Sequence, residues 1–432
     1  MEELPSHLIV DILSRLSDST DLARCRLACS TLRSLSSAVT AVHVTCSPDR
    51  FLRSRDPATA EDLVPFKSLV ANLACLLSSS FLSLCLSVHH PPSATGQEDP
   101  DESDDLHLTA VDFLSQWLPV LASRLTSLSM SDYWIQSCWR RSLALCFISD
   151  HCDNLRSLEL KNAWLSVERM KPMLKLTALA LEFIRLEDEN LDKLNAAFPS
   201  LQVLKLIKVG GLKYPKIRLP HLRVCHWTVS NYPYSLTIDA PELIELNLTC
   251  VEPRSVVLKT PSLLKLNLEI NKPSGIIQLD GLLNLESLRM VASDVQCLIK
   301  LFKGCKAVRK LELDALEYSD KCTTGTFTFE DLLISFPGMN DLKLGPRIIN
   351  NCFEPRCLKM PVEWQKLKYL EVHLSPFDLD FSFMVCILNF CLPNCLVTIL
   401  FHADVSTIDR TQFVSKCSSS FARIRLKWGM WK

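Results

Sequence analysis

A six-residue pattern recurs along most of this chain, with leucine at its first, fourth and sixth positions. Some copies carry conservative replacements, and one early copy starts with phenylalanine. Copies begin at Phe81, Leu125, Leu155, Leu176, Leu201, Leu222, Leu243, Leu263, Leu285, Val308, Met339 and Leu367. From Leu125 onward they follow one another at intervals of roughly 20–31 residues, a period typical of stacked repeats. We therefore predict an array in which each repeat packs against its neighbours.

The copy that begins at Leu155 illustrates why the pattern requires stacking. Leu158 and Leu160 alternate inward on a short strand, and Leu155 turns inward from the preceding loop. A single repeat cannot cover these side chains, but neighbouring repeats bury them, which stabilises the fold by roughly 1.5–3 kcal/mol per leucine. The pattern and period are those of a leucine-rich repeat. We expect an α/β solenoid with parallel strands on its concave face and mixed helices and short strands outside.

The segments between the copies predict what covers the outer face. Alternating β-branched residues between 216 and 281 predict short outer strands, because these stretches are too short for helices. The neighbouring repeats show helical spacing, and Ser293 is positioned to cap one of these helices, with Gly304 ending it. The predicted helices cover 188–198, 295–302 and 329–336.

The stretch from 68 to 88 contains no charged residue and is long enough to cross a bilayer. Its periodicity argues against a membrane span. Leu69, Leu73, Leu76 and Leu77 have helical spacing, whereas the residues from 82 to 88 alternate as in a strand. A helix followed by a strand is one turn of a solenoid, which is the interpretation we adopt.

The composition excludes several classes of protein. The formal net charge is −1, so no global positive charge favours nucleic acid or an anionic membrane. Ten glycines against 23 prolines argue against glycine-rich nucleotide-binding loops. The 19 cysteines are scattered through apolar segments, and the beginning of the chain lacks the basic and apolar regions of a secretory signal. We therefore expect free thiols in a cytoplasmic and/or nuclear protein.

The chain is expected to divide into a helical module at 1–45, a linker at 46–66 and a solenoid at 67–432. Residues 91–105 are acidic and rich in proline and serine, which predicts a solvated loop insertion or a docking segment for a basic partner. The segment 421–426 alternates and predicts a closing strand within a C-terminal cap of about 396–432.

The first forty residues follow a different pattern from the repeats. Apolar residues from Leu8 to Leu16 mark one face of a helix, with Ser6 available as its N-cap. Shorter helices are expected over 20–29 and 30–38. Such a small module buries little surface alone, so its exposed apolar ridge suggests a helical partner.

These residues resemble the F-box family. The resemblance rests on residues 4–16 (LPSHLIVDILSRL) and 22–35 (LARCRLACSTLRSL); Leu32 stands where the family usually has Trp, and Ala28 where Val is common. Together with the repeats, the chain is similar to plant F-box/leucine-rich-repeat proteins. The resemblance implies the substrate-recognition subunit of an SCF-type E3 ubiquitin ligase, bound through a Skp-family adaptor to a cullin–RING ligase. The adaptor-binding residues it implies are Leu4, Pro5, Leu8, Ile9, Ile12, Leu13 and Leu16.

Residues between the inward leucines are expected to face the concave surface, where a target would bind. The predicted target-binding residues are Lys205, His226, Asn247, Asn267, Arg289, Glu312, Lys343 and Glu371. They mix both charges with amides, which suits a protein target better than one ionic ligand.

Alternative functions share the same solenoid. One is an interaction scaffold not coupled to ubiquitination, and another is a small-molecule receptor with an inositol-phosphate cofactor, for which interspersed lysines and arginines would supply charge. Enzymatic motifs for nucleophilic, nucleotide or zinc chemistry are missing from the sequence, although a triad built from distant residues stays formally open. Cys386, Cys391 and Cys395 match no standard zinc spacing, so we interpret them as core residues. We predict no enzyme activity, no cofactor, no metal and no nucleic-acid or membrane partner.

Overall fold

The computed structural model describes most of the 432 residues. The residues that it does not describe are 1–3, 17, 61–62, 77–80, 90–105, 134–139, 187–190, 230–232, 272–275, 304, 317–327, 349–365, 377–378, 380 and 432. The predicted acidic loop at 91–105 and the predicted helix end at Gly304 therefore fall outside the described residues. The chain forms two compact units: Met1–Leu222 with His226–Ser230, and Arg223–Cys225 with Asn231–Lys432.

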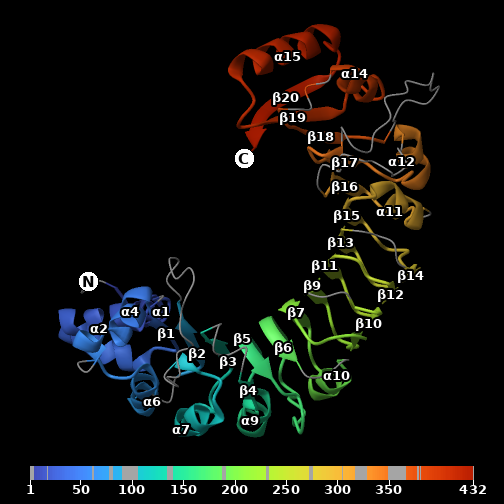
Figure 1. The fold of residues 1–432 in the computed structure, drawn as a ribbon. Helices are drawn as coiled ribbons and strands as arrows, with labels where there is room; N and C mark the ends of the chain where they lie inside the picture. The colour runs from blue at the N-terminus through green and yellow to red at the C-terminus, as the bar shows by residue number, and fades with distance from the viewer. Residues whose placement is uncertain are drawn as a thin grey trace. The chain divides into compact units, whose positions relative to one another are not determined.

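The first unit begins with the predicted small helices, α1 (Ser6–Ser14), α2 (Ser19–Ala28) and α3 (Ser30–Leu35), followed by the 3₁₀ turn η1 (Ser36–Ala38) (Figure 1). The predicted cap is wrong, because Ser6 is already helical and α1 follows Pro5 without a side-chain cap. Asp18 caps α2 by accepting a hydrogen bond from the Thr20 backbone N–H at 3.0 Å.

Parallel strands then follow one another in chain order through the rest of the first unit. They are β1 (Ala41–Cys46), β2 (Ser83–Val88), β3 (Ser127–Ser131), β5 (Ser157–Leu165), β6 (Ala178–Leu186) and β7 (Val203–Val209), with the short β4 (Arg141–Ser142) paired to the end of β5. The six-residue pattern correctly predicts all of the long strands except β1. In β1, valines at 42 and 44 occupy the buried positions that leucines occupy elsewhere.

Helices lie in most of the connections between these strands, although the β5–β6 connection has none (Figure 1). They are α4 (Pro48–Arg55), α5 (Pro57–Ala60), α6 (Phe66–Leu76), α7 (Val111–Leu121), α9 (Ala144–His151) and α10 (Asp192–Ala197). The uncharged stretch is a helix followed by a strand, α6 and β2, as predicted. No helix among the described residues is long and apolar enough to cross a membrane. A helix was predicted over 188–198, and α10 covers most of its second half. Residues 187–190 lie outside the description.

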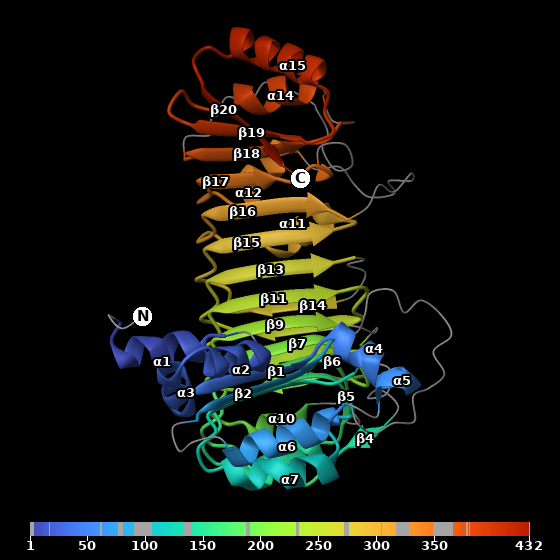
Figure 2. The same cartoon turned by 90° about the vertical axis from the view of Figure 1, so that its left-hand side faces the viewer.

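The second unit continues the same architecture, and Figure 2 shows its strands pointing in one direction. The strand β9 (Val224–Val229) carries residues of both units. The strands that follow are β11 (Glu245–Cys250), β13 (Lys265–Ile270), β15 (Ser287–Ala292), β16 (Lys310–Ala315), β17 (Asp341–Leu344), β18 (Tyr369–Leu374), β19 (Leu396–His402) and β20 (Arg425–Trp431).

Short outer strands are confirmed in the middle of the chain. They are β8 (Lys216–Arg218) in the first unit and β10 (Leu236–Asp239), β12 (Ser255–Lys259) and β14 (Ile276–Asp280) in the second, where the last three pair in parallel. The later connections hold α11 (Val295–Leu301), α12 (Phe329–Ser335), α14 (Phe381–Asn389) and α15 (Thr407–Ser420).

Two local predictions in the second unit are wrong. Asp294, not Ser293, caps α11 by accepting from the Cys297 backbone N–H at 2.9 Å, while the Ser293 hydroxyl donates to the Asn271 carbonyl. The closing strand β20 begins at Arg425 instead of 421, because Phe421 ends α15 and is buried.

The core lies beneath the strands, where inward side chains form columns. Leu158 pairs with Leu179 and Leu160 with Leu181 in the β5–β6 register, and all four are at most 2% exposed. Burial raises the pKa of the Cys225 and Cys250 thiols to about 12, in accord with core positions. The expectation of free thiols holds for the other described cysteines, but Cys386 in α14 is disulfide-bonded.

Candidate functional site: an apolar helix face, a polar strand surface and a pocket

The predicted adaptor-binding residues divide between the exterior and the interior of the N-terminal module. Leu4, Leu8 and Ile12 are 45%, 41% and 53% exposed, and we call these three residues the α1 face. Ile9 and Leu13 are 5% and 3% exposed and pack inside the module. Pro5 is exposed and Leu16 is half-buried. Helical geometry explains the division, since Leu8 and Ile12 lie one turn apart on one side.

Several contacts hold the N-terminal module together beneath the α1 face. The Thr40 backbone N–H donates to the hydroxyl of the buried Ser14 at 3.0 Å, which joins the end of α1 to the residue before β1. Arg26 donates to the Ser36 hydroxyl at 2.9 Å, which links α2 to η1. Leu32, in the position where Trp is usual, is 7% exposed and thus contributes to the core of the module. The α1 face is therefore presented by a packed module.

The predicted target-binding residues of the second unit lie in one row across its sheet. Register pairs join Asn247 with Asn267, Asn267 with Arg289, Arg289 with Glu312, Glu312 with Lys343, and Lys343 with Glu371. We call these six residues the strand surface. The row continues to Thr398 and Lys427, which the sequence interpretation did not include.

The other two predicted residues lie on β7 and β9. Lys205 is on β7 in the first unit, opposite Ala180 of β6. His226 is on β9, the strand that carries residues of both units.

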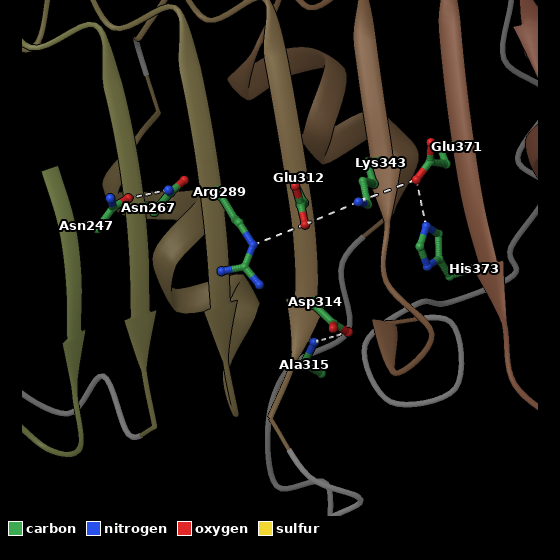
Figure 3. A network of polar contacts seen from close by, with 9 residues as sticks. All are labelled: Asn247, Asn267, Arg289, Glu312, Asp314, Ala315, Lys343, Glu371 and His373. Atoms are coloured by element: carbon green, nitrogen blue, oxygen red, sulfur yellow. Dashed lines mark hydrogen bonds and ion pairs between the residues drawn. The ribbon is translucent and has the colours of Figure 1, made fainter. Parts of the chain in front are cut away.

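Alternating charges on the strand surface pair with one another, as Figure 3 shows. Glu312 Oε1 is 3.1 Å from Arg289 Nε and 3.7 Å from Lys343 Nζ. Glu371 Oε1 is 3.4 Å from Lys343 Nζ and 2.6 Å from His373 Nε2. The Asn267 amide donates to Asn247. Arg289, Glu312, Lys343 and Glu371 are each about one-third exposed. They therefore form ion pairs with one another and are still accessible to a ligand.

Two carboxyl groups near this row have shifted pKa values. Burial alone would raise the pKa of Glu371, but the hydrogen bond with His373 and the charge of Lys343 hold it below its ordinary value. For Asp314, at the end of β16, burial raises the pKa, and backbone N–H donors only partly oppose that shift. The two carboxylates thus differ in how fully their charges are compensated.

A pocket of about 690 Å³ opens at the carboxyl ends of β16 to β20, within the second unit. Its lining includes Glu312 and Lys343 of the strand surface. It also includes residues that the sequence interpretation missed, among them Asp314, Gly345, Arg347, His373, His402 and Trp431. A usable signal was available for Asp314 and His373, since each lies two residues beyond a row position and on the same side of its strand. We call this hollow the C-terminal pocket.

The aromatic wall of the C-terminal pocket comes from three strands. The Trp431 ring lies 4.6 Å from the His402 ring and 5.5 Å from the His373 ring, between centroids. The Trp431 indole N–H donates to the Leu374 carbonyl at 3.3 Å, which fixes the orientation of the ring. His402 Nδ1 is 3.3 Å from Asp404 Oδ2.

Among the described residues, no group of three or more His, Cys, Asp or Glu side chains is arranged to hold a metal ion. Cys391 and Cys395 are 3% and 0% exposed, consistent with the predicted core role. The cysteine cluster beside α14 is therefore part of the packing in the region that the structure describes.

Comparisons with known proteins agree with both the N-terminal helical module and the repeats. The family described as F-box-like matches residues 1–40. An F-box/LRR-repeat protein of Arabidopsis thaliana is 39% identical over 450 residues, an alignment that covers 100% of this chain and 98% of the relative. The chain belongs to the F-box/LRR-repeat family. In this F-box/LRR-repeat protein the α1 face lies within the F-box-like segment, and the strand surface and C-terminal pocket lie on the repeats.

Proposed function

We propose that this F-box/LRR-repeat protein is the substrate-recognition subunit of an SCF-type E3 ubiquitin ligase, acting in the cytoplasm and/or nucleus. Its N-terminal module binds a Skp-family adaptor, and through it a cullin–RING ligase, while its repeats bind a target protein. The carrying observation is the exposure of Leu8 and Ile12 on a packed helix inside the F-box-like segment. Its part is recognition, and the ligase partners supply the chemistry.

The α1 face is suited to a helical partner. Apolar side chains one turn apart form a ridge that fits a groove between helices, and covering it gains roughly 25 cal/mol per Å² of apolar surface. Leu4 and Pro5 extend the ridge ahead of the helix. Ile9 and Leu13 support it from within, and the half-buried Leu16 lies at its end. In this assignment three of the seven predicted residues make the main contact and the buried pair holds them in position.

The strand surface is suited to a protein target. Its charges are already paired, so a ligand must replace those ion pairs with new ones. This favours a ligand with a matching pattern of several charges over one with a single strong charge. Amides at Asn247 and Asn267 extend the same row with hydrogen-bonding groups. Lys205 and His226 are proposed as further target contacts on β7 and β9.

The test compares affinity capture of the full-length wild type with that of Leu8→Asp/Ile12→Asp while the proteasome is blocked. We expect the double variant to lose the Skp-family adaptor, because two carboxylates would have to be desolvated against an apolar groove. The matched control is Leu283→Asp/Ile408→Asp, which places the same charges at positions that are 83% and 70% exposed in the second unit. We expect this control to retain the adaptor.

Circular dichroism and thermal unfolding of both double variants should match the wild type, since all four positions are exposed. Retention of the adaptor by Leu8→Asp/Ile12→Asp would contradict the docking assignment. If the wild type captures targets but no adaptor, the protein is an interaction scaffold and the ubiquitin-ligase role is wrong.

A further inference from the structure

Asp314 carries a carboxylate that the C-terminal pocket leaves incompletely paired. Its Oδ1 accepts from the Ala315 backbone N–H at 2.9 Å and from the Arg347 backbone N–H at 3.4 Å. Across the part of the chain that the structure describes, no donor to Oδ2 and no ion pair to this carboxylate is present. The group lines the pocket and is only partly exposed, so an unused acceptor faces the hollow.

The fold reserves space for this carboxylate at Gly345. A Cβ atom at position 345 would overlap the carboxyl group of Asp314, so any larger residue would displace it. Gly345 is itself buried and also lines the pocket. Glycine is needed at position 345 for a steric and not a conformational reason, because a Cβ atom there would collide with the Asp314 side chain. The backbone of β16 and the glycine after β17 therefore determine where the Asp314 carboxylate lies.

The other charges of the pocket are largely engaged. Lys343 lies between Glu312 and Glu371, and His402 contacts Asp404. Arg347 is exposed, and its positive charge partly offsets that of Asp314 without forming an ion pair with it. A ligand group that enters deeply thus meets an acceptor at Asp314, whereas one that stays outside meets Arg347.

The walls favour a ligand with an apolar stem. Trp431 presents an aromatic ring, and Pro346 and Pro376 add apolar surface to the lining. Cations and the alkyl stems of long basic side chains both pack well on indole rings. The pocket also shares Glu312 and Lys343 with the strand surface, so a chain lying on that surface passes its opening.

We propose that the C-terminal pocket receives one arginine or lysine side chain from an extended segment of the target protein, with Asp314 accepting its cationic head and Trp431 packing on its stem. This inference rests on the proposed function, since it assigns the specificity of the target-binding repeats. The volume of about 690 Å³ exceeds one side chain and leaves room for the adjoining peptide groups.

The test uses ligand-observed NMR on the full-length chain with Nα-acetyl-arginine N-methylamide as the probe. The isosteric citrulline compound, which lacks the charge, is the first control. We expect the arginine probe to bind about tenfold more tightly than the citrulline probe, because hydrogen bonds between charged groups are the stronger ones. Equal binding of the two would overturn the proposal.

Variants locate the binding. Asp314→Asn should weaken the arginine probe by about tenfold, and Gly345→Ala should weaken it similarly by displacing the carboxylate. Asp341→Asn, a carboxyl group on β17 that is absent from the pocket lining, is the matched control and should bind as the wild type does. Thermal unfolding of each variant checks its folding, and a folded Asp314→Asn that keeps full affinity would overturn the proposal.

Arg347→Ala separates a basic ligand from an acidic one. Removing this positive charge should leave the arginine probe unchanged or tighten it. If Nα-acetyl-glutamate N-methylamide binds more tightly than the arginine probe and loses affinity in Arg347→Ala, the pocket takes an anion and the proposal is wrong. The Leu8→Asp/Ile12→Asp variant should bind the arginine probe normally, so failure of the pocket and failure of adaptor docking give different results.

Discussion

The α1 face and the strand surface meet solvent in different ways. On α1, Leu8 and Ile12 expose hydrocarbon that no described neighbour covers. On the strand surface, Glu312 and Glu371 are already paired with Arg289 and Lys343. Covering hydrocarbon releases free energy whatever the exact shape of the partner, whereas paired charges must be exchanged for equally good ones. The first surface is thus suited to binding one constant partner firmly, and the second to discriminating among targets.

The strongest test of this contrast replaces a buried residue behind the α1 face. Leu13→Ala should lower the free energy of unfolding of the N-terminal module by about 2–5 kcal/mol, because it leaves a cavity. Leu8→Ala removes the same atoms from a position that is 41% exposed and should cost much less. Hydrogen exchange of the amides in α1 to α3 measures both, and equal losses of protection would contradict the division of α1 into a covered and an exposed side.

A smaller effect is expected when one charge is removed from the strand surface. Glu312→Gln should lower stability by at most about 1 kcal/mol, since the Arg289–Glu312 pair is about one-third exposed and screened by solvent. A double-mutant cycle with Arg289→Ala isolates the pair, and its coupling energy should shrink in concentrated salt. A coupling that salt leaves unchanged would indicate a pair far less accessible than the structure has it.

Removing the charge of Asp314 should raise stability, whereas removing that of Glu312 should lower it. Burial raises its pKa, so its ionisation is less favourable in the folded chain, and stability is lost as the pH rises from the unfolded pKa through the folded one. We therefore expect Asp314→Asn to raise the melting temperature slightly at neutral pH, an increase that disappears in acid, where the wild-type group is protonated. A lower melting temperature at neutral pH would indicate that the Asp314 charge is compensated in the folded chain.

The smallest effect concerns Glu371. Its pKa is lowered in the folded chain, so its contribution to stability is present above the unfolded pKa and is lost as the pH falls through the folded value. Glu371→Gln should therefore be slightly less stable than the wild type above the unfolded pKa, and this difference should vanish in acid. Thermal unfolding of both proteins from neutral pH into acid is the measurement, and identical pH profiles of the melting temperature would contradict the assignment.

The repeat pattern predicted the strands well because burial alternates over the first four residues of these strands, where the leucines of the pattern lie. A leucine at every second place must face the core, which also determines that Arg289, Glu312 and Lys343 face outward in register. The β1 strand was missed since valine replaces leucine at positions 42 and 44. The α11 cap was misplaced by one residue, because Ser293 and Asp294 are both good caps and only the path of the chain selects between them.

By itself, the sequence determined the repeat architecture, the outer strands, the helical module and the row of residues on the strand surface. These depend on spacing along the chain, which local geometry converts directly into position. Only the tertiary structure decided which apolar residues of α1 stay exposed, and that Asp314, Gly345 and Trp431 line one pocket. Those residues belong to different repeats, and their meeting depends on how the ends of successive strands stack, which no local spacing specifies.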